Sequence, residues 1–481
     1  MINNLPNELL LEIFDFYRRD IHPYDRLWKK KYVWINLTHV CGKWRAVMFA
    51  SSSRLELGII VGPDKPSHIK TILSGPLPIL IDYVFMDKYV TKSALWRLRA
   101  ALGHSDRVRE ITFEGTDGWF EQFFKATDCF FPVLESLSLR FECRYGRGSS
   151  PKLPDTFLKG PDLSDLHLRR LELKHVSLTS ISGFLSSAKT LTNLILEIDL
   201  GENPSAQMRF LVCFQSMRCL RRLDLSTRLY IGIQFLPTPS APKRIVPLSK
   251  LTFFRFVGHI QLLDALVARL SAPSLKDVDI SFSGANSTIG TIVHLLRFIN
   301  GIKKRYHAVH LDLRVWSFNL SLLTQSEHIN HCKPRFKLYQ SSRNSDQSFC
   351  SSLMQLSDAL STKLTDVGDL RVTIVEVAAN PWEDNILWRR FLRQFPNVKA
   401  LRIAGLKSAQ IARIFIRDYT EPDDYFPFLP ALEEIELPKL PALTHETRSQ
   451  LSKCTAELAL FEPFVSARKR RGRPVNVFFG Q

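Results

Sequence analysis

The sequence predicts an α/β protein in which a small helical module, over residues 1–54, precedes a repeating array of short strands and helices over residues 55–481. Two observations lead to this fold class. Apolar residues at helical spacing crowd into the first 50 residues, and the pattern L-x-x-L-x-L recurs along the rest of the chain. A chain of 481 residues with 45% hydrophobic content can bury a large core or build an extended array.

The first helix is predicted over residues 5–17, LPNELLLEIFDFY. Pro6 suits the first turn of a helix, because that turn does not use its N–H, and Glu8 lies near the positive end of the helix dipole. Apolar residues then recur every three or four positions, which places Leu9, Leu10, Ile13, Phe14 and Tyr17 along one face.

The second helical stretch spans residues 34–48 and has the same spacing, with Trp34, Leu37, Val40, Cys41, Trp44, Val47 and Met48. A core shared by two or three such short helices is marginally stable alone. Its surplus apolar stripes are covered either by the rest of the chain or by a separate partner that takes helices in a groove. Periodicity leaves both alternatives open, and packing within the chain is the commoner one.

Both stretches resemble the halves of an F-box, L-P-x-E-L-L-x-x-I-F and V-C-x-x-W-R-x-V, although the segment between them is longer and more basic than usual. The resemblance implies a three-helix module that docks on a Skp-type adaptor, which joins a cullin scaffold in an SCF-type ubiquitin ligase. The adaptor-binding residues that it implies are Leu5, Pro6, Leu9, Leu10, Ile13, Phe14, Val40, Cys41, Trp44 and Arg45.

Strands of the second domain are predicted from the copies of L-x-x-L-x-L. Clear copies begin at residues 134, 168, 191, 220, 251, 275, 398 and 432, and less regular ones begin at 108, 308, 333 and 369. Before them, residues 55–61 and 76–85 are expected to be strands and 92–102 a helix; further helices are expected within 183–190, 259–271 and 290–302. No repeat buries its apolar face alone, so neighbours must stack into one continuous core.

This array resembles an irregular leucine-rich-repeat solenoid, a horseshoe of parallel strands and helices of the kind found in F-box proteins. The resemblance implies a concave face that binds a partner. The residues expected to look out from it lie between the last two apolar positions of each copy: Ser138, Glu172, Ile195, Asp224, Arg255, Asp279, Asp312, Lys337, Thr373, Arg402 and Glu436. Seven charged members of this set are the predicted substrate-binding residues: Glu172, Asp224, Arg255, Asp279, Asp312, Arg402 and Glu436. The mixed charges of the set favour a protein target over a nucleic acid. The alternative fold is an ordinary α/β domain.

The tail, SARKRRGRPVNVFFG, permits two interpretations. Arg471, Gly472, Arg473 and Pro474 reproduce the core of an AT-hook, which lies in A·T-rich minor grooves. Against this, residues 461–468 have helical spacing, Gly472 suits a helix stop, and 475–479 alternate as a strand. We expect the tail to close the last repeat, with a nuclear-import patch or DNA binding as the alternatives.

The sequence lacks the motifs of several classes of enzyme and metal site. His328, His331 and Cys332 match no common zinc spacing, and no nucleophile elbow, phosphate loop or glycine fingerprint is found, so we expect neither an enzyme nor a cofactor. Eight cysteines without a C-x-x-C pair indicate reduced thiols. No apolar run is long enough for a membrane span and no signal peptide is evident, so we expect an intracellular protein, cytoplasmic or nuclear or both.

The sequence therefore predicts a non-enzymatic substrate-recognition subunit of an SCF-type ubiquitin ligase. Its partners would be a Skp-type adaptor, through it a cullin, and a protein substrate, without membrane or nucleic acid. The alternatives are a repeat scaffold outside any ligase and a DNA- or chromatin-associated protein that uses the basic tail. The net charge of +18 permits attraction to acidic partners or phosphates without choosing between them.

Overall fold

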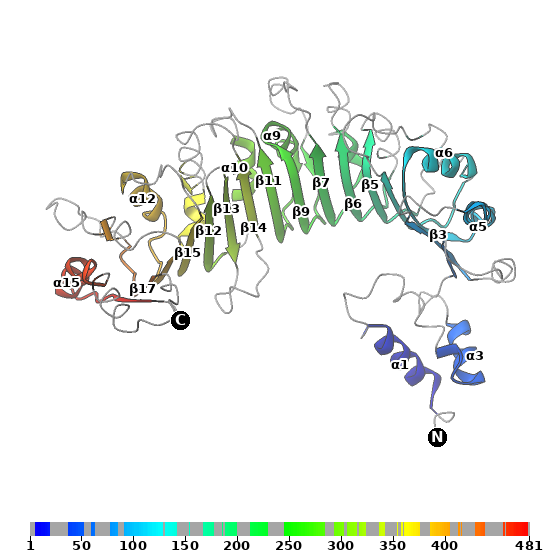
Figure 1. Cartoon of the computed structure of the whole chain (residues 1–481), viewed down its shortest axis with the longest axis horizontal. Coiled ribbons are helices and arrows are strands. Elements are labelled where there is room, and N and C mark those ends of the chain that lie inside the picture. The colour runs from blue at the N-terminus through cyan, green and yellow to red at the C-terminus, as the bar shows by residue number, and fades with distance from the viewer. Residues whose placement is uncertain are drawn as a thin grey trace. The chain divides into compact units, whose positions relative to one another are not determined.

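The computed structural model (Figure 1) describes most of the regular structure of the chain. The described residues are 5–19, 37–51, 59–62, 77–84, 91–127, 130–141, 153, 167–177, 185, 188–199, 212–228, 245–283, 293–302, 305–314, 317–323, 336–341, 354, 357–358, 360–375, 385–404, 412–413, 415, 429–437, 456 and 458–479. Within these ranges, no helix combines the length and the apolarity that crossing a membrane requires.

The chain divides into two compact units, Met1–Leu220 and Arg221–Gln481, and each contains strands in a mostly parallel α/β arrangement. The first unit opens with the helices α1 (Asn7–Arg19) and α3 (Gly42–Ala50). Its strands are β1 (Ile59–Val61), β2 (Ile79–Val84), β3 (Val108–Gly115), β4 (Ser136–Phe141), β5 (Arg170–Ser177) and β6 (Asn193–Asp199). Its other helices are α5 (Lys92–Leu102), α6 (Asp117–Ala126) and the 3-10 turn η3 (Phe214–Ser216).

Helices α1 and α3 pack against each other over a small core of their own (Figure 1). Leu10, Phe14 and Met48 are fully buried, and the Phe14 and Trp44 rings meet edge to face with centroids 5.0 Å apart. Lys43 closes the module by donating from Nζ to the Leu5 carbonyl over 2.7 Å. The first predicted helix is therefore confirmed. In the second predicted stretch, 34–48, helix α3 begins only at Gly42, after a turn at residues 39 and 40. Residues 20–36, between the two halves of the module, lie outside the described residues.

Strands β1 to β6 of the first unit lie side by side in chain order, and every pair is parallel. Buried and half-buried residues alternate along β3, so that Ile111 and Phe113 point into the apolar core while Thr112 and Glu114 point to the opposite face. We call that opposite face, which carries the side chains between the buried apolar ones, the polar face. The strands and the helix predicted between 55 and 105 match β1, β2 and α5.

The second unit contains a longer run of strands, β7, β9, β11, β14, β13, β12, β15, β16, β17 and β18 in that order. They span Arg222–Arg228, Phe253–His259, Asp277–Ser283, Phe336–Ser341, Ser317–Leu323, Ala308–Arg314, Asp369–Val375, Ala400–Ala404, Glu434–Leu437 and Asn476–Phe479. Helices α9 (Ile260–Val267), α10 (Val293–Asn300), α12 (Asn385–Leu392) and α15 (Glu462–Arg470) accompany them, with a small pair formed by β8 (Val246–Pro247) and β10 (Leu270–Ser271). The helices expected within 259–271 and 290–302 are therefore present.

One strand of the second unit departs from the expected all-parallel order. Strand β13 is antiparallel to both of its neighbours, β12 and β14, so these three strands form a meander between β11 and β15. The sequence SFNLSLL of β13 alternates apolar and polar residues like any half-buried strand, but it contains no copy of the repeat motif. A search for the motif alone therefore misses it.

A backbone hydrogen bond recurs at the start of successive strands. In the first unit the Glu135 N–H donates to the Arg109 carbonyl, and the Arg169 N–H donates to the Glu135 carbonyl, each over 2.8 Å. In the second unit the Lys399 N–H donates to Gly368 and the Glu433 N–H to Lys399, again over 2.8 Å. The bonded residue is always the second one of the motif, so the copies occupy equivalent places.

This recurring bond corrects two of the less regular copies. The Gly368 N–H donates to the His307 carbonyl over 2.9 Å, which makes these two the second residues of their copies. The true copies are therefore YHAVHL from 306 and VGDLRV from 367, with Tyr306 and Val367 buried in the first position. The predicted starts at 308 and 369 are wrong by two residues, because alternating apolar residues fit the motif in either register.

Candidate interaction surfaces

Helix α1 carries two apolar stripes side by side. Leu10, Leu11 and Phe14 face the module's core. Leu9, Ile13, Phe16 and Tyr17 share the adjoining side, because a helix turns by about 100° per residue. Their exposed fractions are 46%, 41%, 72% and 42%. We call these four residues the α1 stripe. Large apolar side chains gathered in this way make it a candidate interaction surface.

The ten predicted adaptor-binding residues separate into three groups in the structure. Pro6, Leu9, Ile13 and Val40 are exposed, whereas Leu10 and Phe14 are fully buried and Leu5 and Trp44 pack against the same core. Cys41 and Arg45 order the backbone: the Trp44 N–H donates to Cys41 Sγ at the start of α3, and Arg45 Nε donates to the Thr38 carbonyl over 3.0 Å. The exposed Phe16 was not predicted, although its spacing from Leu9 and Ile13 places it on the same side.

In each unit the polar face carries residues that are expected to look out from the concave face, among them most of those predicted for substrate binding. In the first unit Ser138, Glu172 and Ile195 are cross-strand partners in one row. In the second unit Asp224, Arg255, Asp279 and Lys337 follow one another across β7, β9, β11 and β14. Arg402 and Glu436 are partners on β16 and β17. The Lys337 side chain lies outside what the structure describes.

Two residues predicted for the row in the second unit do not lie in it, because the motif copies on β12 and β15 begin two residues earlier than predicted. The row runs from Lys337 through Ser321 and His310 to Arg371 and then to Arg402. Asp312 and Thr373, which were expected there, lie two residues further along their strands. They still point to the polar face, because side chains two apart on a strand share a face.

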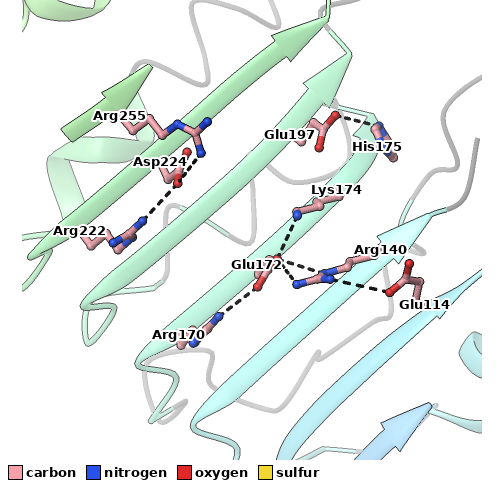
Figure 2. Close-up of polar contacts among 10 residues, drawn as sticks. All are labelled: Glu114, Arg140, Arg170, Glu172, Lys174, His175, Glu197, Arg222, Asp224 and Arg255. Carbon is pink, nitrogen blue, oxygen red and sulfur yellow. Dashed lines mark hydrogen bonds and ion pairs between the residues drawn. The ribbon is translucent and has the colours of Figure 1, made fainter. Parts of the chain in front are cut away.

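The most densely charged point of the first unit surrounds Glu172 (Figure 2). Arg140 Nη2 lies 2.8 Å from Glu172 Oε1, Arg170 Nη2 lies 3.2 Å from Oε2, and Lys174 Nζ lies 3.4 Å from Oε1. Burial by itself would raise the pKa of Glu172, but these cations, Arg140 foremost, outweigh it and hold the pKa below its ordinary value. Glu172 is therefore ionised and firmly held.

A second buried acid, Asp224 of the second unit, is held less firmly (Figure 2). Arg222 and Arg255 approach its Oδ2 atom only to 3.5 and 3.8 Å. Burial raises the pKa of Asp224, and the two arginines do not offset that effect. Arg255 also reaches Asp279 at 3.4 Å, and Arg222 lies over the Phe253 ring at 3.8 Å from its centroid. Both arginines are thus shared with other groups.

A third cluster of the polar face has its charges reversed. Arg402 is the central residue, and it donates to Glu436 from Nε over 2.8 Å and to Asp369 from Nη1. Nearby, His310 Nε2 lies 3.2 Å from Thr373 Oγ1, and burial and Arg371 lower the pKa of His310. The imidazole is therefore neutral at physiological pH. The polar face offers alternating charges rather than a field of one sign.

The tail forms the last helix and strand of the second unit, as expected. Helix α15 ends in a Schellman motif, in which the Gly472 N–H donates to Lys469 and the Arg473 N–H to Arg468, with Gly472 at φ 72°. Arg468 is buried and donates to the Leu429, Pro430 and Leu432 carbonyls. Lys469, Arg470, Arg471 and Arg473 are exposed around this turn. The arginine-glycine-arginine segment is thus part of a folded turn, not an extended strand.

Among the residues that the structure describes, no group of three or more His, Cys, Asp or Glu side chains lies close enough to hold a metal ion. His328, His331 and Cys332 fall outside those residues. Compared with known proteins, the chain matches no protein-family model and no curated protein. Its function is therefore inferred from the surfaces described above.

Proposed function

We propose that the chain is a substrate-recognition subunit of an SCF-type ubiquitin ligase. In this proposal α1 and α3 form an F-box module that docks on a Skp-type adaptor. The α/β part is a leucine-rich-repeat solenoid whose polar face binds a protein substrate. Ubiquitin transfer is catalysed by other subunits, and the chain contributes by raising the local concentration of its substrate near them.

The observation that carries the proposal is the α1 stripe beside the core of the module. Within the described residues, Leu10 and Phe14 pack in that core, whereas Leu9, Ile13, Phe16 and Tyr17 remain more than 40% exposed. Transfer of one such side chain from water into an apolar groove is worth about 1.5–3 kcal/mol. The stripe sits in the segment with F-box resemblance, which supports a Skp-type adaptor as its occupant.

The experiment is titration calorimetry of the whole chain with a purified Skp-type adaptor. The test variant is Leu9→Asp/Ile13→Asp, which puts charge on the stripe without entering the core. Ile245→Asp is the matched control, since Ile245 is an exposed apolar residue of the second unit. We expect binding by the original chain and the control, and at least about a hundredfold weaker binding by the test variant, from the loss of two buried anchors.

The proposal fails if the original chain, folded by circular dichroism, does not bind a competent adaptor. It also fails if the test variant and the control bind equally well. In either case α1 and α3 would serve within the chain, and a repeat scaffold outside any ligase would be the better account.

A further inference from the structure

The charges around Glu172 are unequal in number and in exposure. Three cations, Arg140, Arg170 and Lys174, converge on this one carboxylate. The Glu172 side chain is 4% exposed, while the three cationic side chains are 38%, 50% and 32% exposed. We call these four residues the β4–β5 cluster. It presents positive donors to solvent above a buried negative charge.

A neighbouring acid offsets part of this excess (Figure 2). Glu114 of β3 forms a longer ion pair with Arg140, at 3.8 Å, which is beyond hydrogen-bonding distance. Glu197 of β6 lies 3.6 Å from His175 Nδ1. The two acids thus flank the cluster on the outer strands, and the positive charge is concentrated over β4 and β5.

Two further features single out this point of the sheet. His175 adopts φ 58°, and the pairing of β5 with β6 shifts register between Lys174 and Val176. A left-handed backbone conformation is strained at a residue other than glycine, and such strain gathers at functional sites. In addition, Ser138, the cross-strand partner of Glu172, has a buried hydroxyl without a hydrogen-bond partner in the structure. Arginine, lysine and hydroxyl groups can all donate hydrogen bonds to the same kind of acceptor group on a ligand.

We propose that the β4–β5 cluster is a docking point for an anionic side chain on an extended segment of the substrate protein. This inference rests on the proposed function for the identity of the partner and adds its chemistry. Arg140 already donates to Glu172 from both Nε and Nη2. A carboxylate or phosphate above β5 would therefore accept hydrogen bonds mainly from Arg170 and Lys174 and from the remaining N–H groups of Arg140. Glu114 and Glu197 would meet basic residues that flank the anionic one.

The test is fluorescence anisotropy of the full chain with a labelled peptide of six glutamates. Arg170→Ala/Lys174→Ala removes two of the exposed donors, and Lys469→Ala/Arg470→Ala removes the same charge from the exposed end of α15. We expect affinity to fall about tenfold for the first variant, as the loss of two ion pairs predicts, and less than about twofold for the control. Glu172→Gln should bind more tightly than the original chain, because it removes the repelling charge.

Equal losses of peptide affinity in the two double variants would show nonspecific electrostatic attraction and overturn the proposal. Unchanged or weaker peptide binding by a folded Glu172→Gln variant would also overturn it. A second peptide, with phosphoserine in place of glutamate, distinguishes a phosphate from a carboxylate. The expected order of affinities among the variants, seen with either peptide, supports the docking point. The peptide that binds more tightly identifies the preferred anionic group. Adaptor binding is measured on the same variants. None of them touches α1, so adaptor binding should be unchanged in all of them. If the original chain binds the adaptor but neither peptide, this inference alone is rejected.

Discussion

Arg170-Leu-Glu172 and Arg222-Leu-Asp224 are nearly the same tripeptide, and each places an acid on the polar face two residues after an arginine. Their carboxylates nevertheless differ in state. Three cations within 3.4 Å keep the pKa of Glu172 low, whereas burial dominates for Asp224, whose arginines stand at 3.5 and 3.8 Å. A few tenths of an ångström and one additional cation decide which effect prevails.

This difference predicts opposite outcomes for two matched substitutions. Glu172→Gln should lower the free energy of unfolding by about 2 kcal/mol at neutral pH, because it removes charge-assisted hydrogen bonds. Asp224→Asn should leave that free energy unchanged or raise it, because it removes a charge that burial disfavours. Urea denaturation of both variants measures the two changes.

The pH dependence follows from the sign of each shift. The contribution of ionised Glu172 to the free energy of unfolding is fully present above its ordinary pKa of 4.5, and it is lost as the pH falls through the lower pKa that Glu172 has in the folded chain. The stability lost in Glu172→Gln relative to the original chain should therefore become smaller in acid. For Asp224 the raised pKa means that the folded chain loses stability as the pH rises through it. If Asp224→Asn lowers the free energy of unfolding at neutral pH by more than Glu172→Gln does, this account is contradicted.

Among the elements, α1 shows what amphipathic spacing can and cannot predict. Spacing correctly predicts that Leu9, Leu10, Ile13 and Phe14 share a broad apolar arc. It does not predict that Leu10 and Phe14 are fully buried while Leu9 and Ile13 remain exposed. That division depends on where α3 packs, which is a tertiary property. The predicted contact set therefore mixed residues that fold the module with residues available to a partner.

The strands show the same limit in another form. Clear copies of the motif predict β4, β5, β6, β7, β9, β11, β16 and β17, because leucines two apart fix which face is buried. At β12 and β15 apolar residues alternate over a longer run, so two registers fit the motif and the sequence alone does not distinguish them. The charged clusters of the polar face could not be predicted, since an ion pair depends on which strands become neighbours.

The end of α15 supplies a prediction at this scale. Gly472→Ala should destabilise the second unit by about 1 kcal/mol, because φ 72° at this position is unfavourable for a residue with a Cβ atom. Gly42→Ala is the matched control: Gly42 has no positive φ, and a Cβ there meets nothing within 4 Å. Urea denaturation should therefore separate the two variants. Equal effects would show that the turn does not need its left-handed residue.

For the whole molecule, we expect the sheet to tolerate the loss of β13 and β14, the last two strands of the meander. Arg314, Ser317 and Ser341 lie at one level across β12, β13 and β14, so the ends of β12 and β14 are two strand spacings apart, about 10 Å. Removal of residues 315–341 would therefore join chain ends that are already close. It would also leave β11 and β12 pointing the same way.

We expect the chain without residues 315–341 to fold and to unfold cooperatively, with a lower midpoint in urea because Leu320 and Leu322 leave the core. Far-UV circular dichroism with urea denaturation measures this, and Leu311→Asp, which charges the core of β12, is the control that should not fold. An aggregated or unfolded deletion variant would mean that the meander is required to build the sheet.

The meander also widens the sheet without turning the later strands around. Strands β13 and β14 follow β12 in the sequence but lie between β11 and β12, while β15 pairs parallel with β12 on its other side. The strands after the meander therefore run in the same direction as the strands before it. The two added strands enlarge the polar face at this place and leave the orientation of every later copy of the motif unchanged.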